Sequence, residues 1–333
     1  MKKTLLLLTI LLAALTARAQ ALRFRQGEFK IAQFTDLHYV TGNAASEQAL
    51  ACISEICRDE KPDFIILTGD IIYSKPGFAA MQLVLNTLSA QKIPFAVTFG
   101  NHDDEQGTSL TDLYDQIQKA PGCVMPDRKT SRTMDYVLPI KASAGEKDAA
   151  LLYCLYSHNR SRMAGVGGYQ WLNFDQIRWY REQSSTLATA NGGKPLPALA
   201  FFHIPLQEFN DAVANPQCVL YGTRMERAHA ANLNSGMFTA MKESGDVMGI
   251  FCGHDHDNDY SVMYYDVLLA HGRFSGGNTE YNHLRNGARI IVLKEGKRQF
   301  DTWIHERGGQ ILYRTSYPSS YKKDNWKKRK GTR

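Results

Sequence analysis

The chain has 333 residues, a net charge of +6 and a mean hydropathy of −0.34, values that fit one large globular α/β domain. The positive charge is concentrated at one end, because residues 322–333 alone contribute +6 while residues 20–321 sum to −3. The body of the chain is therefore not suited to polyanions, and we expect no nucleic-acid-binding surface. Residues 322–333 are expected to form a basic tail outside the folded domain.

The N-terminus predicts export. Two lysines precede the apolar run 5–15, and small residues up to Ala19 follow it, which is the order of a secretory signal peptide. An uncleaved membrane anchor is the alternative, but the run is short against the roughly 20 residues of a membrane span. We therefore expect a signal peptide at 1–19, a single domain at 20–321, and a secreted or periplasmic protein with no transmembrane segment after cleavage.

Five apolar runs have the pattern of buried strands, and each ends in polar residues. The runs are 29–35, 63–68, 94–99, 198–202 and 247–252. Between the first three lie segments with helical periodicity, 47–58 and 81–90, so strands alternate with helices. Such βαβ units form parallel sheets, whose functional side chains gather at the carboxyl ends of the strands. We therefore expect the five polar clusters to converge.

The residues in these clusters are metal ligands by type. Seven of them offer nitrogen or oxygen donors: Asp36, His38, Asp70, Asn101, His203, His254 and His256. This mixture suits iron, zinc or manganese better than magnesium or calcium. Seven donors are too many for one tetrahedral zinc ion, but they fit two ions about 3.5–4 Å apart that share one carboxylate. Asp70 is the best shared ligand, because the preceding Gly69 keeps the backbone clear.

The order of these motifs resembles the calcineurin-like metallophosphoesterase superfamily, which includes the purple acid phosphatases. The motifs are Asp36-x-His38, Gly69-Asp70, Gly100-Asn101-His102-Asp103, His203 and Gly253-His254-x-His256. Residues 201–209 and 253–260 look most like the phosphohydrolases related to the purple acid phosphatases. The resemblance implies a two-sheet β-sandwich flanked by helices, two divalent or trivalent metal ions (Fe, Zn or Mn), and hydrolysis of a small-molecule phosphate ester.

The resemblance also implies a role for each residue. One metal is held by Asp36, His38, Asp70 and His256, and the other by Asp70, Asn101, His203 and His254. A hydroxide that bridges the metals is the implied nucleophile. His102 is not a ligand in the family: it stabilises the transition state or protonates the leaving oxygen, and Asp103 or another carboxylate orients it.

The first metal site departs from one branch of the family. True purple acid phosphatases use a Tyr three residues after the shared Asp, and Tyr73 stands at that spacing. Their first motif lacks the histidine that this chain has at His38. We expect His38 to be the ligand, since Asp-x-His is the commoner arrangement in the superfamily, and Tyr73 to pack beside the site.

Substrate contacts are expected from the segments between and after the motifs. Residues 104–197 and 205–246 are expected to form a cap that selects the substrate. Within and beyond the cap, His158, Arg160 and Arg273 are candidates to bind phosphate, because a monoester carries one more negative charge than a diester.

Further elements are expected around and after the motifs. A helix should begin near Asn173, and the preceding aromatic residue Tyr169 should lie in the core. Three alternating runs are typical of antiparallel strands and should complete the second sheet: 262–269, 288–293 and 300–304.

Taken together, these features favour an exported, binuclear phosphohydrolase, with a phosphomonoesterase preferred over a phosphodiesterase of the same fold. A binding module that keeps the fold and the metals without turnover is the alternative from another class. That module predicts a missing ligand or a replaced His102, and the sequence shows neither. A metalloprotease lacks support, because the sequence contains no HExxH motif.

Overall fold

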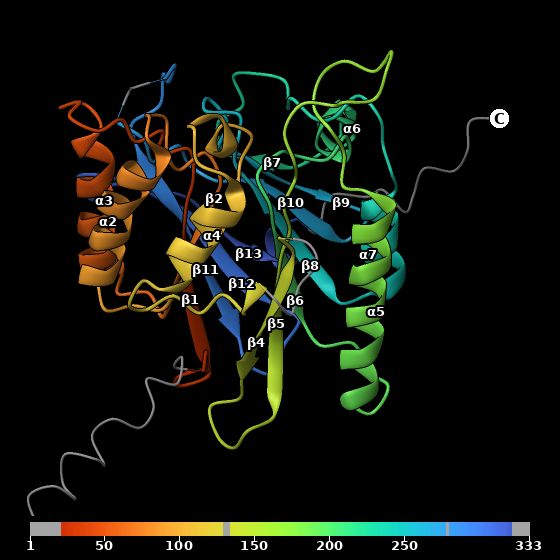
Figure 1. Ribbon diagram of the computed structural model, residues 1–333. Helices are drawn as coiled ribbons and strands as arrows, with labels where there is room; N and C mark the ends of the chain where they lie inside the picture. Colours follow the sequence, from red (N-terminus) through yellow and green to blue (C-terminus); the bar gives the residue numbers. More distant parts are fainter. Residues whose placement is uncertain (1–20, 129–133, 278–279, 322–333) are drawn as a thin grey trace, which may run out of the picture.

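The computed structural model describes residues 21–128, 134–277 and 280–321 (Figure 1). The expected signal peptide at 1–19 and the basic tail at 322–333 lie outside these residues. Among the described residues, no helix combines the length and the apolar character that crossing a membrane requires.

The fold is a sandwich of two mixed β-sheets with helices on its outer faces, as expected (Figure 1). The first sheet has the order β13 (Ile311–Tyr317), β12 (Phe300–Glu306), β11 (Gly287–Lys294), β1 (Glu28–Phe34), β2 (Phe64–Thr68) and β3 (Phe95–Thr98). The second has the order β4 (Tyr136–Lys141), β5 (Asp148–Cys154), β6 (Ala198–Phe201), β8 (Val247–Cys252), β10 (Val267–His271), β9 (Ser261–Tyr264) and β7 (Leu220–Tyr221).

The parallel strands are β1, β2 and β3 at one end of the first sheet, and β5, β6, β8 and β10 in the middle of the second. Helices α2 (Glu47–Glu60), α3 (Gly77–Ala90) and α4 (Leu110–Gln118) lie on the side of the first sheet, and α5 (Phe174–Ala190) and α7 (Met237–Ser244) on that of the second (Figure 1). The short helix α6 (Glu208–Ala214) lies near the strand ends, and 3-10 turns occupy Asp103–Glu105 and Ser319–Tyr321.

Central strands of the second sheet, such as β6 and β8, are buried on both faces, which explains their continuous apolar runs. Along β5, Leu152 faces the core between the sheets, whereas Leu151 and Tyr153 face the helix side. The helix side is filled by residues such as Tyr180 from α5 and Met241 from α7. Because side chains alternate along a strand, one run of apolar residues serves both cores.

The helix expected near Asn173 begins there. Asn173 is the N-cap of α5, and its backbone N–H donates a 2.8 Å hydrogen bond to Oε1 of Gln176 in the first turn, as in one half of a capping box. The helices expected at 47–58 and 81–90 are α2 and α3, and α3 begins four residues earlier than the periodicity indicates, at Gly77.

Two expectations about the chain are corrected, one on the strands after residue 261 and one on the segment 104–197. The run 262–269 is a hairpin of β9 and β10, turning at Tyr265 and Asp266, which both have positive φ. It belongs to the second sheet, but β11 and β12 extend the first sheet beside β1. The segment 104–197 is also no separate cap, because it contributes β4 and β5 to the second sheet and α5 to its outer layer.

Candidate metal centre

The expected donors lie at the carboxyl ends of five strands, three in the first sheet and two in the second. Four of them leave their strands by a sharp turn, since Asp36, His38, Asp70 and His254 have φ between 44° and 79°. Residues other than glycine rarely adopt this conformation, which costs on the order of 1–3 kcal/mol each. The surrounding packing must therefore hold these four side chains in place.

Two glycines leave room for the carboxylates. A Cβ at Gly100 would overlap Oδ1 of Asp70, and a Cβ at Gly253 would overlap the Thr35 hydroxyl and crowd Oδ2 of Asp36. The Thr35 hydroxyl donates a 2.7 Å hydrogen bond to that Oδ2. The glycines of the Gly-Asn-His-Asp and Gly-His-x-His motifs therefore have a steric role.

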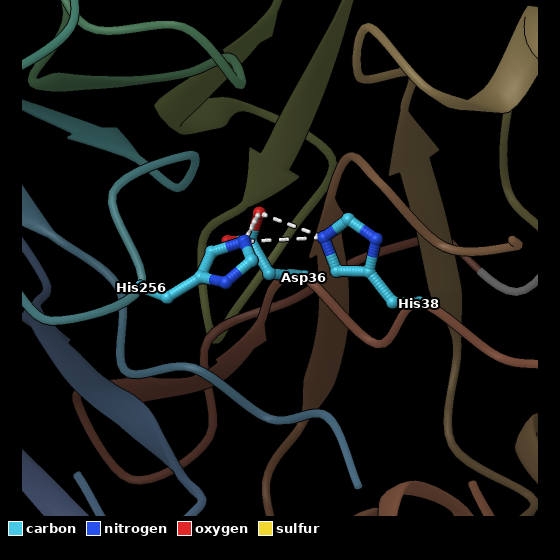
Figure 2. A group of neighbouring side chains, drawn as sticks. All are labelled: Asp36, His38 and His256. Carbon is cyan, nitrogen blue, oxygen red and sulfur yellow. Dashed lines mark hydrogen bonds and ion pairs between the residues drawn. The ribbon is translucent and has the colours of Figure 1, made fainter. Parts of the chain in front are cut away.

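The first donor group consists of Asp36, His38 and His256, all buried (Figure 2). Oδ1 of Asp36 lies 3.8 Å from Nε2 of His38 and 3.5 Å from Nε2 of His256. The two imidazole nitrogens are 3.1 Å apart. Figure 2 shows the carboxylate between the two rings, so three donors from β1 and β8 face one point.

The second donor group consists of Asp70, His203 and His254. Nε2 of His203 lies 3.0 Å from Oδ2 of Asp70 and 3.2 Å from Nδ1 of His254. Asn101 is buried next to Gly100, which packs on Asp70, and its Oδ1 has no hydrogen-bond partner in the described part of the chain. A buried amide oxygen without a partner is costly, and a cation is one partner that it accepts.

The two groups adjoin at Asp70. Its Oδ2 is 3.8 Å from Nε2 of His38 in the first group and 3.0 Å from Nε2 of His203 in the second. Carboxylate, amide and imidazole donors are the set that iron, zinc and manganese accept. The residues present therefore fit a pair of metal ions with Asp70 between them.

The electrostatics of the site also favour cations. Burial opposes the charge on Asp36 and Asp70, but His203 and the other neighbouring histidines together outweigh it and hold the pKa of both carboxyls below the usual range. Burial likewise opposes a charged imidazole, yet the nearby carboxylates raise the pKa of His203 to about 10 and of His256 to about 9. The two aspartates thus stabilise positive charge at this point.

Backbone carbonyls orient two of the imidazoles. Nδ1 of His203 lies 2.9 Å from the Thr68 carbonyl, and Nδ1 of His256 lies 2.7 Å from the Tyr281 carbonyl. A carbonyl only accepts hydrogen bonds, so Nδ1 carries the hydrogen in both rings. Nε2, which faces the carboxylates, is then the nitrogen available to bind a metal.

The aspartates of the Gly-His-x-His turn have other partners. Asp255 lies 2.7 Å from Nδ1 of His229, Asp257 lies 2.6 Å from Nδ1 of His283, and Asp259 pairs with Arg273. They fasten neighbouring loops to the turn, and the imidazoles that they contact do not belong to the seven expected donors. Asp255, His229 and Glu226 form a third group of possible ligands.

His102 lies beside the first donor group, with its ring centroid 5.6 Å from that of His38. Its backbone N–H donates a 2.8 Å hydrogen bond to Oδ1 of Asp70. Its Nδ1 lies 2.6 Å from Oε2 of Glu105, because the 3-10 turn after His102 brings Glu105 back toward the ring. A carboxylate therefore orients this imidazole, and the His102 side chain remains 28% exposed.

Asp103 or another carboxylate was expected to orient His102, and in the structure Glu105 contacts the ring while Asp103 has other partners. Asp103 is fully buried, and its two oxygens accept hydrogen bonds from four backbone N–H groups: those of Asp70, Ile71, Ile72 and Gly100. Burial and the neighbouring charge of Asp70 raise the pKa of Asp103 to about 7. This side chain fixes the turns after β2 and β3.

Arg273 does not have the substrate contact that the sequence suggested. Its side chain is 3% exposed, forms ion pairs with Asp259 and Glu306, and donates a 2.7 Å hydrogen bond to the Arg285 carbonyl. A guanidinium enclosed by two carboxylates has no free face for phosphate. Arg273 instead joins the turn after β8 to β12.

The other two candidate substrate residues lie on the loop after β5. Nε2 of His158 lies 2.7 Å from Oε1 of Gln176, so this ring packs against the start of α5. The Arg160 guanidinium lies 4.8 Å from the ring centroid of Tyr169, and that ring meets His254 edge-on at 4.5 Å. Tyr169 is therefore a neighbour of the second donor group and not a core residue.

Two tyrosines flank the first donor group. Tyr73 packs against His38 and His102 at centroid distances of 5.4 and 5.2 Å, as expected of a residue beside the site. Tyr281 stacks on His256 at 4.5 Å and 17°, a contact that sequence reasoning missed. Nothing in the sequence pattern marks Tyr281, because it lies outside every motif in an irregular segment.

The two-sheet scaffold and the paired donor groups place the chain among the metal-dependent hydrolases that use two adjacent ions. More specifically, the chain belongs to the calcineurin-like phosphoesterase family, whose model matches residues 29–258. It is therefore a metallophosphoesterase, a class of phosphoric ester hydrolase.

Individual relatives agree with this assignment. Probable inactive purple acid phosphatase 29 of Arabidopsis thaliana is 31% identical over 326 residues, covering 86% of this chain and 82% of the relative. Probable inactive purple acid phosphatase 14 of the same plant is 27% identical over 323 residues, covering 85% and 79%. The fold is similar to that of a dimetal phosphatase from Danio rerio, with a TM-score of 0.60, 13% identity, and coverage of 86% and 98%.

Proposed function

We propose that the protein is an exported phosphohydrolase that binds two metal ions and cleaves phosphate monoesters. The observation that carries this proposal is the position of Asp70, whose Oδ2 reaches toward His38 at 3.8 Å and His203 at 3.0 Å. A carboxylate between two donor groups is what a pair of adjacent ions requires.

The proposed ligands divide as the two groups do. Asp36, His38 and His256 would hold one ion, His203, His254 and Asn101 would hold the other, and Asp70 would be the carboxylate available to both. When bound, such ions lower the pKa of a water molecule and neutralise charge on the phosphoryl oxygens. The carbonyl contacts of His203 and His256 keep their Nε2 atoms aimed at the site.

His102 is the proposed acid for the leaving oxygen. Its ring is next to the first donor group, and an imidazole at this position can donate a proton or a hydrogen bond to the substrate. Glu105 also fixes the direction of the ring, because the 2.6 Å contact engages Nδ1 and leaves Nε2 for the substrate.

The preference for monoesters is supported by Arg160. A monoester dianion gains more from a nearby guanidinium than a diester monoanion does. Arg160 lies one aromatic ring away from His254, whereas Arg273 is buried in its own ion pairs and gives no such support. Phosphodiester hydrolysis at the same centre is the second candidate.

A binding module without turnover remains the alternative from another class, and the names of the two Arabidopsis relatives contain the word inactive. In this chain, however, the donor groups are complete and His102 has its carboxylate partner. A protein that had lost catalysis would be free to lose the strained backbone at the donor residues and the glycines that leave room for the carboxylates.

Export is proposed from the order of charged, apolar and small residues at 1–19. Intact-mass analysis of the protein released from producing cells tests it. A mature chain that begins near Gln20 is the expected result, and a cell-associated chain that retains Met1 would contradict it.

The central test is hydrolysis of p-nitrophenyl phosphate and bis-p-nitrophenyl phosphate by residues 20–333 loaded with manganese, iron or zinc. We expect metal-dependent turnover with the monoester faster. Asn101→Ala is the matched variant: it removes a neutral ligand, so it should lose one ion per chain by metal analysis and most of the activity. Two bound ions without turnover of either ester would favour the binding module.

A further inference from the structure

A pocket of about 410 Å³ lies beside the second donor group. Its walls include Tyr169, Asp211, Arg227 and the segment 228–232. Two of its residues touch the metal centre, because the rings of Tyr169 and His229 meet the ring of His254 edge-on at centroid distances of 4.5 and 6.4 Å. This Tyr169 pocket therefore adjoins the proposed ligand His254.

The far wall of the Tyr169 pocket is fixed by hydrogen bonds. The Gln207 amide donates to the Ala231 carbonyl at 2.8 Å, and Asn210 both donates to the Ala228 carbonyl at 2.8 Å and accepts from its N–H at 3.2 Å. The N–H of His229 donates to Asp255 at 3.1 Å, which ties the same segment to the turn after β8. A wall held at both ends is preorganised to bind a ligand.

The chemistry of the lining selects polar ligands. Tyr169 is the only large apolar surface among the lining residues, and the remainder are amides, alanines, glycine, an imidazole and two charged side chains. Arg227 is exposed, and within the described ranges no hydrogen bond or ion pair engages its guanidinium. Arg160 adds a second guanidinium on the ring of Tyr169. The two guanidiniums outnumber the one carboxylate among the lining residues, that of Asp211.

We propose that the Tyr169 pocket holds the leaving group of the phosphate ester and favours a hydroxylated leaving group with a second anionic group for Arg227. The volume fits a group of monosaccharide size, since small-molecule sites begin at about 300 Å³. Tyr169 supplies an aromatic wall, and Arg227 supplies a fork of donors for a carboxylate or a phosphate. This inference rests on the proposed phosphohydrolase function, because it assigns the part of the substrate that leaves.

The test compares specificity constants of the metal-loaded protein for glycerol 3-phosphate, 3-phosphoglycerate and fructose 1,6-bisphosphate. The first two differ by a hydroxymethyl group against a carboxylate, and the third offers a second phosphate. We expect the parent protein to have a higher specificity constant for the esters with a second anionic group than for glycerol 3-phosphate. Arg227→Gln should lower this ratio by on the order of tenfold, the scale of one charge-assisted hydrogen bond. Asp211→Asn should raise it, because a repelling charge is removed.

Arg181→Gln is the matched control, since Arg181 is an exposed arginine of α5 that pairs with Glu243. It should leave the ratios unchanged. A fall confined to 3-phosphoglycerate identifies a carboxylate as the second anion, and one confined to the bisphosphate identifies a phosphate. Turnover with a ratio that Arg227→Gln does not alter would overturn the pocket assignment alone. Absence of turnover with all three esters and with p-nitrophenyl phosphate would overturn the proposed function beneath it.

Discussion

At the scale of single residues, His102 and its partner Glu105 allow metal binding to be separated from catalysis, because neither belongs to the two donor groups. His102→Asn removes the imidazole and keeps a polar side chain, so both donor groups should still bind their ions. We expect kcat to fall by about 10²- to 10⁴-fold, the usual range for a general acid, with little change in metal content. Glu105→Gln should cost less, because the ring remains.

Steady-state kinetics with metal analysis on the same samples checks the His102 prediction. Lost metal in His102→Asn would assign the residue to the ligand set. Unchanged kcat with full metal content would remove it from the mechanism.

Gly100 gives a steric prediction at the same scale. Any Cβ here meets the carboxylate and the backbone of Asp70, and backbone cannot move aside cheaply. We expect Gly100→Ala to lower the free energy of unfolding by about 2 kcal/mol or more and to weaken metal binding, since Asp70 must shift. Gly167→Ala is the control, because its Cβ would meet nothing within 4 Å. Equal metal affinity and equal urea midpoints in the two variants would show that the site tolerates the displacement of Asp70.

Among the elements, β5, β8 and α5 are joined by one carboxylate. The Tyr153 hydroxyl of β5 donates to Oδ2 of Asp246 at 2.8 Å, and the Tyr180 hydroxyl of α5 donates to Oδ1, just before β8 begins. Burial, and then the charge of Asp246, raises the pKa of both phenols above the usual range. Both phenols therefore stay neutral in the folded chain at pH values where exposed phenols ionise.

The two phenols that donate to Asp246, here called the Asp246 clamp, predict that the protein loses stability in alkali. Above pH about 10 the unfolded chain releases phenol protons that the folded chain retains, so the free energy of unfolding falls as pH rises. The double variant Tyr153→Phe/Tyr180→Phe should be less stable at pH 8, because Asp246 loses two donors, but should lose less stability between pH 8 and 10.5. Urea unfolding at both pH values measures this, with the exposed Tyr313→Phe as control. A parallel fall in the double variant and the parent would exclude the clamp as its source.

The elements also show what the sequence can and cannot specify. Apolar runs and their polar ends predict β1, β2, β3, β6 and β8 and the donors that follow them, because both properties are local. Which strands pair is not local: β11 returns to β1 across most of the chain, so the sequence pattern placed it in the wrong sheet.

The same limit explains the errors at the site. Arg273 looked available for phosphate because its partners, Asp259 and Glu306, are distant in sequence. Asp103 was a reasonable partner for the adjacent His102 by proximity. The 3-10 turn decides otherwise, since it directs Glu105 to the ring and buries Asp103 under the backbone of β2's end.

For the whole molecule, the donor groups link the two halves of the sandwich. The first sheet supplies Asp36, His38, Asp70 and Asn101, and the second supplies His203, His254 and His256. Each proposed ion therefore has ligands from both sheets, and it binds the folded chain but not the unfolded one. Such binding stabilises the fold by about 2.7 kcal/mol per site when the free metal exceeds its Kd 100-fold.

Metal removal should consequently lower the Tm by several degrees and loosen the junction between the sheets. We expect a chelator to increase amide exchange first at the ends of β1, β2 and β8, where the ligands lie, and to leave the β11–β12 pairing protected. In Asn101→Ala the effect of the chelator on Tm should be smaller, because one ion is already weakened. If chelation changed neither Tm nor exchange at these strand ends, the ions would not join the sheets, and the stability of the sandwich would rest on its two apolar cores alone.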